Sequence, residues 1–529
     1  MNSSCFEPHG LAGMSRPFAS MFVASVMLAS AGPLCAAAAS DGVVGKFDPG
    51  VAAAWRAKSG KPLRVLIEPV AEAAKADEAL PQDRPSRLRA QYARLASTAR
   101  LSQAPIVRWL ARRGIAYRSF TVVNAIAAEL TPAQAYALAR RSDVRYLADD
   151  PVVRQQLPGP GTASTKDACT ATAGVTWGID RVHADDVWAL GFRGQGVVVA
   201  GQDTGYDFDH PALIAQYRGN GPTIVHDHHW HDAIHALIGA GANSCGVNLA
   251  APCDDGSHGT HTMGTMVGEN DATGFTVGVA PDAKWIGCRN MEEGDGTPST
   301  YLECFDWFLA PTDLAGANAN PALAPHVINN SWGCPTSEGC TSANWAQMNT
   351  AIDNLTTAGI LVVASAGNSG PGCGSINTPA AMFANALTVA WTNNSLDNAL
   401  NGGSSRGPVS ADGSNRMKPD IAAPGSSVCS TVPGTGYSSG FSGTSMAGPH
   451  VAGVAALLMS AFPALKNDPP AVREILLQSA SPLPQAGTCG GTAGNERPNP
   501  MTGWGLVDAM AAFQRANLQS TGLFENGFE

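Results

Sequence analysis

The sequence has few charged and few aromatic residues, and it lacks several patterns that would assign it to a special class. Of its 529 residues 14% are charged and 7% aromatic, whereas 44% are hydrophobic and glycine occurs 58 times. This composition excludes a disordered chain and is typical of a globular protein with many loops. Beyond the N-terminus no stretch is apolar and long enough to span a bilayer. No repeat of roughly 20–50 residues and no long low-complexity tract occurs, so no repeat architecture is predicted.

The N-terminus has the features of a signal peptide, which we expect over residues 1–39. Arg16 provides the positive flank, residues 18–31 form the apolar run, and the alanines at 36–39 form a small-residue cleavage site. A buried apolar helix is the alternative, whereas the residues before Cys35 lack the pattern that precedes a lipid-modified cysteine. We therefore expect a secreted protein, either periplasmic or extracellular, without a stable membrane anchor.

Cysteine is present but never with the C-x-x-C spacing that is common in zinc sites, so disulfides are the favoured interpretation. An even number of cysteines in an exported chain predicts disulfide bonds, although spacing alone leaves their connectivity open. The closest candidate pairs are Cys245 with Cys253 and Cys334 with Cys340. The cysteines beyond the expected signal peptide stand at positions 169, 245, 253, 288, 304, 334, 340, 373, 429 and 489.

Positive charge is concentrated in the first part of the chain and scarce in the second. Residues 40–166 hold 20 Lys and Arg against 11 Asp and Glu, a net charge of +9. Residues 167–529 hold 12 against 31, a net charge of −19. A nucleic-acid-binding arm and a mutual attraction of the two parts are the two interpretations of this contrast. We favour the attraction and expect no nucleic-acid partner.

The basic segment is predicted to be a small two-layer α+β unit. Thr131 is the expected N-cap of its second helix, because Pro132 suits the first helical position. The order strand–helix–strand–strand–helix–strand is that of ferredoxin-like units. The arginines of the long first helix are expected on a solvated outer face or on a surface for an acidic partner. Five of these six elements are placed, at 64–67, 84–110, 117–123, 132–141 and 145–153.

The acidic part alternates short β-branched runs with helical patterns, which predicts a buried parallel sheet. In such sheets the chemistry gathers beyond the carboxyl ends of the strands. The expected strands lie at 197–200, 283–288, 327–330, 360–364 and 386–389. The expected divisions are the signal peptide at 1–39, the α+β unit at 40–156, a Pro- and Gly-rich linker at 157–175, the α/β unit at 176–517 and a tail at 518–529.

Three residues are candidates for a Ser-His-Asp catalytic triad. Asp203 lies just beyond the first strand of the acidic part, at its carboxyl end. His258 opens a helical pattern with small residues, and Ser445 precedes the apolar helix at 451–458. A serine hydroxyl becomes nucleophilic when a neutral imidazole accepts its proton, and a carboxylate orients that imidazole. Alone, the aspartate could be a cap and the histidine a structural residue, as we expect for His261.

The start of the apolar helix suits a catalytic serine. Ser445 is expected at its N-terminus, where free N–H groups favour developing negative charge. Pro449 also fits a place near the start of this helix. Because proline has no N–H, it leaves the Ser445 carbonyl unpaired, which is tolerable at a helix start and costly in the middle of a helix.

Three motifs carry a family resemblance: D-T-G at 203–205, S-H-G-T-H at 257–261 and G-T-S-M-A-G-P-H at 443–450. In this order they resemble the subtilisin-like serine protease family, in which the triad follows the chain order Asp, His, Ser. The resemblance covers about residues 177–517 and implies a three-layer α/β fold with a mainly parallel sheet. It implies a serine endopeptidase that acts through an acyl-enzyme. Within the family the bacillopeptidase F branch is most similar, at 229–235, 284–291 and 329–334.

The resemblance also implies the residue that stabilises the oxyanion. The family's oxyanion-hole asparagine lies in a motif matched by S-A-G-N-S at 365–369, which makes Asn368 the expected amide donor. The backbone N–H of Ser445 is the expected second donor. Without the resemblance, an asparagine beside glycine is simply a turn residue. Ser369 places no charge beside Asn368, which favours an apolar or broad preference for the substrate residue before the scissile bond.

Two further segments match the family. Ser331, Trp332 and Gly333 match the edge segment that pairs with extended substrates, although Trp332 could equally belong to the core. The basic segment resembles the family's propeptide, which covers the active site as a tethered inhibitor and assists folding. A slowly folding parallel sheet gives that assistance a physical reason. We therefore expect a monomeric zymogen that cleaves itself between Gln155 and Thr176 and then acts on proteins or peptides.

A dense group of histidines is the main rival site. His231 and His235 are spaced i, i+4 and could clasp a metal if they lay on a helix. The pattern lacks the glutamate of H-E-x-x-H, so a structural or cleft-wall role is favoured and no metal site is predicted. No loop carries a decisive spacing of calcium ligands, and the chemistry requires no cofactor. The other members of the group are His226, His228 and His229.

A catalytically inactive binding module on the same fold is the alternative function. All three triad residues and Asn368 are present, which argues against that alternative. The intact set therefore favours an active endopeptidase.

Overall fold

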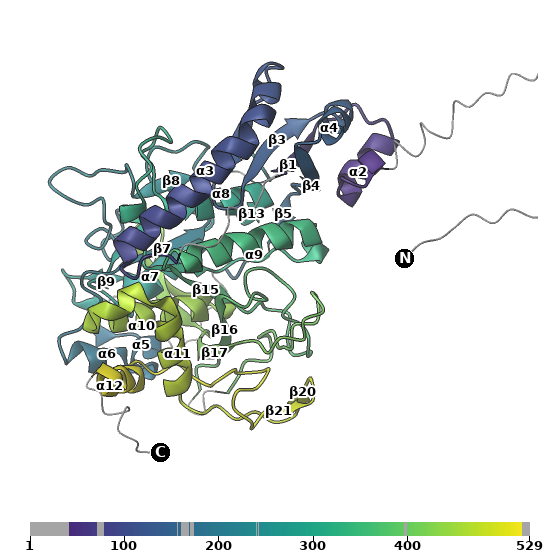
Figure 1. Cartoon of the computed structure of the whole chain (residues 1–529). Helices are drawn as coiled ribbons and strands as arrows, with labels where there is room; N and C mark the ends of the chain where they lie inside the picture. Colours follow the sequence, from purple (N-terminus) through teal and green to yellow (C-terminus); the bar gives the residue numbers. More distant parts are fainter. Residues whose placement is uncertain are drawn as a thin grey trace, which may run out of the picture. The chain divides into compact units, whose positions relative to one another are not determined.

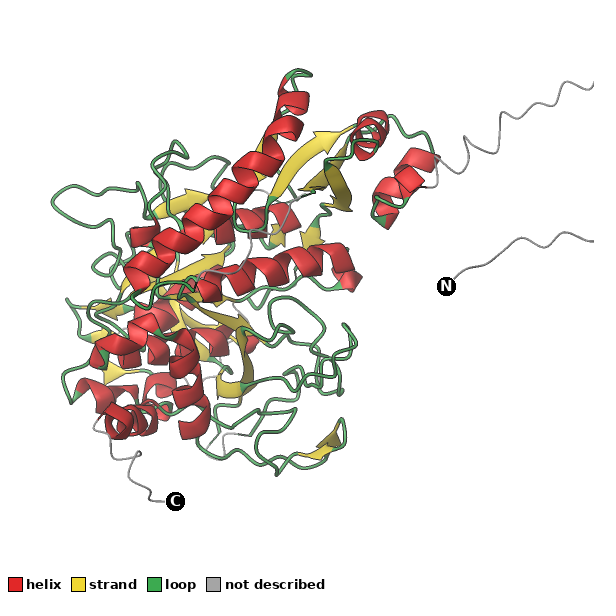
Figure 2. Cartoon of the chain, viewed as in Figure 1, coloured by secondary structure: helices red, strands yellow, loops and turns green. Residues whose placement is uncertain are grey.

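A computed structural model describes residues 42–70, 79–155, 157–159, 169, 174–239, 241, 243–395 and 399–520. The chain divides into two units, residues 1–45 and residues 46–529, and the elements below belong to the second. Figure 1 shows them in sequence colours and Figure 2 by type. The expected signal peptide lies outside the described residues. Within the described ranges, no helix combines the length and the apolar character that crossing a membrane requires.

Helices and short strands alternate along most of the second unit. The α-helices are α2 (Pro49–Arg56), α3 (Arg84–Ala111), α4 (Pro132–Ala139), α5 (Trp177–Arg181), α6 (Ala184–Trp188), α7 (His258–Val267), α8 (Pro298–Leu309), α9 (Ser342–Thr357), α10 (Thr444–Ala461), α11 (Pro469–Ser479) and α12 (Ala509–Ser520). Short 3-10 helices are η1 (Pro321–Leu323), η2 (Thr336–Glu338) and η3 (Pro463–Asn467). The strands are β1 (Leu63–Pro69), β2 (Tyr117–Phe120), β3 (Ala125–Leu130), β4 (Val144–Asp149), β5 (Val153–Arg154), β6 (Gly174–Val175), β7 (Val198–Asp203), β8 (Trp230–Asp232), β9 (Glu269–Asn270), β10 (Phe275–Thr276), β11 (Lys284–Arg289), β12 (Met291–Glu292), β13 (Asp295–Gly296), β14 (Val327–Asn330), β15 (Leu361–Ser365), β16 (Ala386–Thr392), β17 (Ile421–Pro424), β18 (Val428–Val432), β19 (Gly436–Phe441), β20 (Thr488–Cys489) and β21 (Thr492–Ala493).

The basic segment forms an antiparallel sheet in the order β2-β3-β1-β4, connected by α3 and α4. This is the ferredoxin-like arrangement that the sequence predicts. The strand expected over 117–123 ends earlier, at Phe120, and the next strand, β3, begins at Ala125 after a turn. Thr131 caps α4 as expected, and Gln134 completes a capping box with it.

The acidic part contains a seven-stranded sheet in the order β17-β16-β15-β14-β7-β11-β8. Every neighbouring pair in this sheet is parallel, which confirms the predicted sheet type. All five predicted strands are present, with boundaries that differ by a few residues. β7 continues beyond the expected 197–200, so Asp203 is the last residue of the strand rather than a residue after it.

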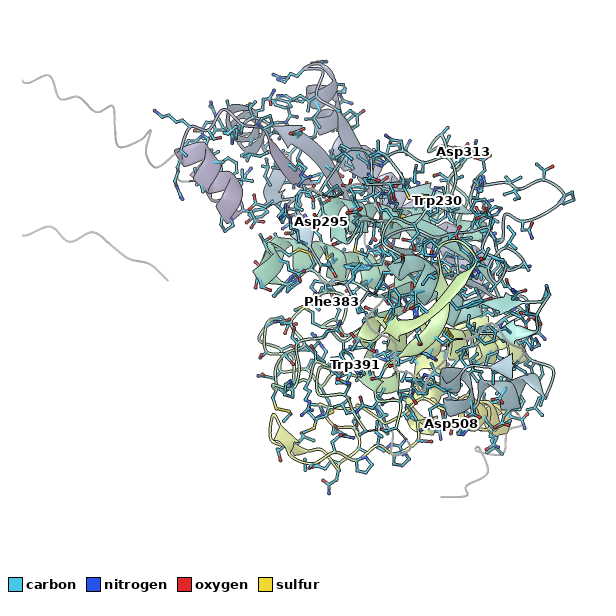
Figure 3. The ribbon with its side chains drawn as sticks, turned by 180° about the vertical axis from the view of Figure 1, so that it is seen from behind. Trp230, Asp295, Asp313, Phe383, Trp391 and Asp508 are labelled. Atoms are coloured by element: carbon cyan, nitrogen blue, oxygen red, sulfur yellow. A yellow bond between two sulfur atoms is a disulfide. The ribbon has the colours of Figure 1, made fainter. Side chains whose placement is uncertain are left out.

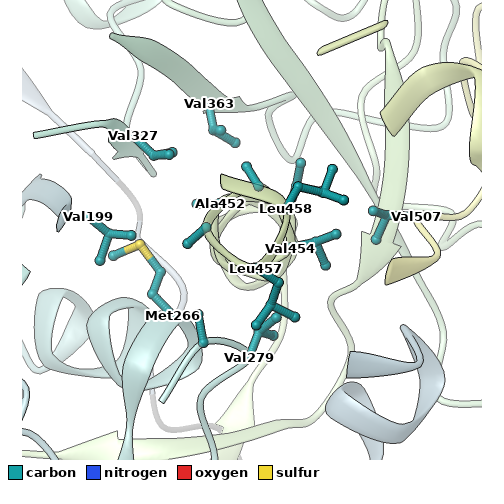
Figure 4. Packing of buried hydrophobic residues seen from close by; sticks show 14 of the residues in the cluster. Val199, Met266, Val279, Val327, Val363, Ala452, Val454, Leu457, Leu458 and Val507 are labelled. Carbon is teal, nitrogen blue, oxygen red and sulfur yellow. The ribbon is translucent and has the colours of Figure 1, made fainter. Parts of the chain in front are cut away.

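Two hydrophobic cores cover the two faces of the parallel sheet, because successive residues of a strand point to opposite faces. Val199, Val327 and Val363 pack with residues of α7 and α10 on one face. Ala200 and Ile328 pack with residues of α8 and α9 on the other. Figure 4 looks along α10 and shows the three valines around it. The sheet therefore lies between two layers of helices, as the three-layer α/β fold requires.

The second core continues into the basic segment. Leu88 of α3 and Phe120 of β2 belong to the same buried cluster as residues of α8 and α9. β2 contacts α8, and β4 contacts α9. The antiparallel sheet thus packs over these two helices, and α3 runs along the same side of the molecule in Figure 1.

One arginine of the long helix is buried, contrary to the expected solvated or acid-facing side chain. Arg84 is only 6% exposed, and its guanidinium donates to the carbonyl oxygens of Gly359 at 3.2 Å and Ala324 at 3.1 Å. Burial and, to a smaller extent, the charge of Arg87 lower the pKa of Arg84 to about 10. Gly359 lies just past the C-terminal end of α9, where a positive charge is favourable. Arg84 therefore docks the basic segment through main-chain carbonyl groups rather than through carboxylates.

Two carboxylates of the basic segment contact the N-terminal ends of α8 and α9, the two helices that this segment covers. Asp150 Oδ1 accepts the backbone N–H of Ser299 at 2.8 Å, in the first turn of α8. Asp48 Oδ2 accepts the hydroxyl of Thr341, the N-cap of α9, at 2.7 Å. Negative charge is favourable at helix N-termini, so these contacts add to the attraction between the basic and acidic parts.

Five disulfides pair all the cysteines beyond the expected signal peptide. Both close candidate pairs, Cys245 with Cys253 and Cys334 with Cys340, are confirmed. The remaining bonds join more distant residues, which spacing alone could not assign. They are Cys169–Cys429, Cys288–Cys304 and Cys373–Cys489.

Because these five bonds use every cysteine beyond the expected signal peptide, we expect the exported protein to have almost no free thiol. Losing one native disulfide typically costs about 2–5 kcal/mol, against a typical net stability of about 5–15 kcal/mol. We expect denatured but unreduced protein to react with very little thiol reagent. The same sample after reduction is the control and should show the ten thiols of the five bonds. About eight or more reactive thiols before reduction would contradict the expectation.

Candidate active site

Asp203 and His258 meet where β7 ends and α7 begins. His258 Nδ1 lies 2.8 Å from Asp203 Oδ1, and both residues are 1% exposed. The same carboxylate oxygen accepts the backbone N–H of Thr204 at 2.8 Å. A buried carboxylate that accepts the Nδ1 hydrogen fixes the tautomer in which Nε2 is free to act as a base.

Asp254 holds the loop that presents His258, a role that the sequence analysis missed. Its Oδ1 accepts the backbone N–H groups of Gly256 and Ser257, each at 2.9 Å. Its Oδ2 accepts the N–H of Thr260 at 2.9 Å and the hydroxyl of the same residue at 2.5 Å. Burial raises the pKa of Asp254, and these hydrogen bonds oppose the rise. The available sequence signal was an acidic residue four positions before the histidine.

Ser445 lies in the first turn of α10, and two serines fix that turn. The Ser445 carbonyl, which Pro449 leaves without a helical partner, accepts the hydroxyl of Ser331 at 3.0 Å. The Thr444 carbonyl accepts the hydroxyl of Ser365 at 3.0 Å. These serines stand at the carboxyl ends of β14 and β15. The parallel sheet therefore positions the start of the helix directly.

The Ser445 hydroxyl points toward a neighbouring carbonyl. Its Oγ lies 3.3 Å from the carbonyl oxygen of Ser331. Among the described residues, His258 Nε2 has no hydrogen-bond partner. Serine side chains change between staggered rotamers, and hydrogen bonds of a catalytic pair often tighten only when substrate binds. A rotation about the Cα–Cβ bond of Ser445 is the change that would turn its hydroxyl away from this carbonyl.

Asn368 is held in one orientation by the helix start. The backbone N–H and the hydroxyl of Thr444 donate to Asn368 Oδ1 at 3.0 and 2.9 Å. Because a backbone N–H can only donate, the amide oxygen must face Thr444, which leaves Nδ2 available to another acceptor. Asn368 and Ser445 line one cavity of about 240 Å³. An amide donor and a hydroxyl therefore border the same space.

The segment expected to pair with substrate also lines this cavity, but the ring of Trp332 belongs to the core. Trp332 is 4% exposed and stacks on Tyr301 with 4.2 Å between ring centroids. Gly333, the next residue of the segment, is partly exposed and lines the cavity. The lining that the sequence analysis missed includes Pro335, Glu338, Asn377 and Thr378. Burial raises the pKa of Glu338 to about 7, so this wall carries little negative charge below neutral pH.

The chain's own residues 153–155 lie extended against a neighbouring edge. β5 pairs antiparallel with β13, and the N–H of Gln155 continues the pairing by donating to the Gly294 carbonyl at 3.2 Å. Asp295 of β13, labelled in Figure 3, stands where the basic segment meets this edge. β13 could not be predicted from the sequence, because a two-residue strand carries no periodic pattern.

Gln155 also reaches the predicted substrate segment. Its side-chain nitrogen donates to the Gly333 carbonyl, and its Oε1 accepts the Gly333 N–H at 3.0 Å. Gln155, Leu157 and Pro158 line the same cavity as Ser445. The start of the expected linker therefore occupies the space next to the candidate nucleophile.

His231 and His235 do not lie on a helix, so their i, i+4 spacing does not place them on one helical face. His231 is the middle residue of β8, and His235 follows in a loop. Glu303 of α8 lies beside both side chains, and this glutamate is distant in the sequence. His226 and His228 instead contact the Tyr217 hydroxyl and the Pro311 carbonyl, as structural histidines do.

His261 has the structural surroundings that the sequence analysis expects. Its Nε2 lies 3.0 Å from the Val428 carbonyl and 3.1 Å from the Ser438 carbonyl. Burial lowers the pKa of His261 to about 3 despite these two carbonyl contacts. The imidazole is therefore neutral over the physiological range and ties α7 to β18 and β19.

A family model and several known proteins match this chain. Residues 194–505 match the model of a family described as the Subtilase family. Bacillopeptidase F of Bacillus subtilis (strain 168) is 38% identical over 353 residues, which are 65% of this chain and 22% of that protein. M-protease of Shouchella clausii (strain KSM-K16) is 32% identical over 349 residues, 66% of this chain and 72% of that protein. Subtilisin Savinase of Lederbergia lenta is 34% identical over 294 residues, 55% of this chain and 87% of that protein.

Proposed function

The chain belongs to the Subtilase family, a family of serine-type endopeptidases, and we propose that it hydrolyses peptide bonds in proteins through Asp203, His258 and Ser445. The observation that carries the proposal is the buried 2.8 Å hydrogen bond between His258 and Asp203. The cavity lined by Ser445 and Asn368 supports it further. A nucleophile, a base, an orienting carboxylate and an amide donor are the parts that acyl transfer requires.

In the proposed reaction the Ser445 hydroxyl attacks the carbonyl carbon of the scissile peptide bond. His258 Nε2 accepts the hydroxyl proton as the new C–O bond forms, and the carbonyl electron pair moves onto its oxygen. The C–N bond then breaks, the imidazolium gives its proton to the leaving amine, and an acyl-enzyme remains. Water, activated by the same imidazole, releases the acid and restores the serine. Asp203 stays ionised throughout and stabilises the imidazolium.

The negative charge on the carbonyl oxygen is stabilised by donors that are in place before the reaction. Asn368 Nδ2 and the backbone N–H of Ser445 are the proposed donors, and the N-terminus of α10 adds its dipole. Thr444 holds the Asn368 side chain by two hydrogen bonds, so little reorganisation is needed as charge develops.

The proposed substrates are extended segments of proteins or peptides. β13 already accepts an extended strand of the same chain, and Gly333 already hydrogen-bonds with Gln155. Main-chain pairing of this kind gives affinity that depends little on side chains, which favours a broad substrate range.

The proposed precursor consists of a signal peptide at 1–39, a propeptide at 40–156, a linker at 157–175 and the peptidase unit at 176–517. The packing of the basic segment on α8 and α9 and the presence of Gln155 in the cavity support a tethered inhibitor. A tethered segment has a high effective concentration, which strengthens inhibition without new contacts. Cleavage before Cys169 would leave its disulfide to Cys429 within the mature enzyme.

The mature enzyme is proposed to be a secreted monomer.

Subtilases need no cofactor for their chemistry, because side chains and main-chain N–H groups supply the nucleophile, the base and the donors.

The proposal is tested by labelling the protein with a fluorophosphonate, which reacts with an activated serine. We expect labelling of the mature protein at Ser445, located by peptide mapping. We expect at least about 10³-fold slower labelling of His258→Ala protein whose basic segment has been removed by another protease, since the base is gone. Heat-denatured protein is the control for unspecific labelling. Failure of the folded, matured protein to label at Ser445 would favour the inactive binding module instead.

A further inference from the structure

Glu303 of α8 lies outside the triad, and three positively charged or protonatable groups converge on one of its oxygens. His231 Nε2 lies 2.7 Å and His235 Nε2 lies 2.8 Å from Glu303 Oε1, and the guanidinium of Arg118 donates to the same oxygen. The Glu303 side chain is 8% exposed. Burial alone would raise the pKa of Glu303, but the two histidine hydrogen bonds and the charge of Arg118 outweigh it and lower the pKa to about 2.

We propose that His231, His235 and Glu303 form a binding site for a divalent transition-metal ion of the zinc type. One nitrogen of each imidazole and one carboxylate oxygen all lie within 4.8 Å of one another. Two imidazoles and one carboxylate are a common zinc ligand set, with water in the fourth position. Calcium and magnesium prefer sites made of oxygen ligands, so the two imidazoles select against them.

The strand and the helix that carry these ligands are cross-linked. β8 pairs with β11 so that Cys288 stands opposite His231. The disulfide from Cys288 to Cys304 then joins this strand pair to the residue after Glu303. The His231 ring also stacks on Trp307, with 5.7 Å between ring centroids. Two of the three ligands are therefore held in place before any ion binds.

The third ligand has a partner that sets its tautomer. His235 Nδ1 lies 2.5 Å from Asn248 Oδ1, in a loop closed by the disulfide between Cys245 and Cys253. An imidazole that donates its Nδ1 hydrogen to an amide oxygen can offer the Nε2 lone pair to a metal. Burial alone would lower the pKa of His235, but Glu303 outweighs that effect and raises it. Metal binding would replace the Nε2 proton.

In the uncleaved chain, the guanidinium of Arg118 in β2 is hydrogen-bonded to the Glu303 carboxylate. This guanidinium is a monovalent cation at the position where a metal ion would contact Glu303 Oε1, so the two compete. Competition between a metal and the docked basic segment is reciprocal, because each weakens the other by the same factor. This regulatory consequence rests on the proposed role of residues 40–156 as a propeptide, whereas the metal site itself does not.

The test uses the full chain with Ser445→Ala, which keeps Arg118 in place. Zn²⁺ binding is measured by equilibrium dialysis, and the absorption of bound Co²⁺ reports imidazole and carboxylate ligation. We expect a single bound ion and, on adding Arg118→Ala, binding that is roughly fivefold tighter or more. Adding Glu303→Gln or His235→Ala should weaken binding beyond the roughly 10–100-fold that is typical for loss of an outer-shell partner. Glu303→Gln keeps the size of the side chain and an oxygen that accepts hydrogen bonds. This variant therefore disturbs the fold less than His235→Ala does.

Two control variants remove the same residue types elsewhere. Arg113→Ala removes an arginine that lies over the ring of Trp109. His183→Asn removes a histidine that is paired with Asp508. Asparagine is chosen there because it tolerates the backbone φ of 55° at position 183. Neither should change Zn²⁺ binding. Absence of a bound ion in the Arg118→Ala protein, or binding unchanged by both ligand variants, would overturn the site. Binding that needs the ligands but ignores Arg118→Ala would overturn the competition. Maturation of the wild-type chain is scored separately, so these outcomes differ from a failure of the proposed peptidase function.

Discussion

Replacing Ser445 by alanine is expected to lower kcat for peptide hydrolysis by roughly 10⁶-fold, a magnitude known from subtilisin itself. The alanine lacks the oxygen that forms the acyl-enzyme, so His258 and Asp203 have no nucleophile to activate. The remaining rate, about 10³–10⁴-fold above water, would come from oxyanion stabilisation and binding. The measurement compares kcat of wild type with that of Ser445→Ala protein whose basic segment has been removed by another protease.

The same variant should accumulate as the uncleaved chain when it is produced without other proteases. Wild-type protein should instead begin between Gln155 and Thr176, before Cys169, as N-terminal sequencing would determine. Ser460→Ala is a matched control, because Ser460 lies in the same helix but its hydroxyl bonds to Gln195 outside the cavity. A Ser445→Ala protein that matures with the wild-type N-terminus under these conditions would show that processing needs another enzyme.

The candidate triad could be predicted from sequence because each residue sits at a position with a short-range signal. Asp203 follows shortly after a β-branched run, and His258 precedes small residues that allow α7 to pack closely. Pro449 marks the start of a helix because it cannot donate within it. These signals depend on a few neighbouring residues, and therefore they survive without knowledge of the tertiary fold.

The contacts that position the triad could not be predicted, because they join residues distant in the sequence. The hydroxyl of Ser331 satisfies the carbonyl that Pro449 leaves free, across a separation of 114 residues. The same limit applies to the histidine group, because Glu303, which lies beside His231 and His235, comes from α8, 68 residues after His235. A spacing rule for one helix cannot find a ligand that a different element provides.

The burial of one arginine of α3 could not be predicted from the sequence either. A helix with many arginines predicts a solvated face, since isolated buried charges are costly. Arg84 is buried nevertheless, because the carbonyl oxygens of Ala324 and Gly359 replace the water that its guanidinium loses. The composition of the helix indicated its overall polarity but not which arginine would dock.

Asn368→Ala is expected to lower kcat by about 10²–10³-fold and to leave KM nearly unchanged. The reason is that the amide donor acts on charge that appears only as the transition state forms, so bound substrate gains little from it. The magnitude is again one known from subtilisin. Steady-state kinetics on a peptide substrate would measure kcat and KM separately for the matured, folded protein.

The alanine also removes the acceptor of the Thr444 N–H, so lost stability has to be separated from lost catalysis. Asn368→Asp does this, because a carboxylate oxygen can still accept that N–H while the side chain has no donor for the oxyanion. We expect Asn368→Asp to keep the melting temperature within a few degrees but to lose at least as much kcat as alanine, since its charge repels the oxyanion. Thr444→Val removes the hydroxyl that contacts Asn368 and accepts the Gly367 N–H but keeps the backbone N–H contact, so we expect it to lose less kcat than either Asn368 variant. If Asn368 were only a turn residue, Asn368→Asp would keep full kcat in its folded fraction.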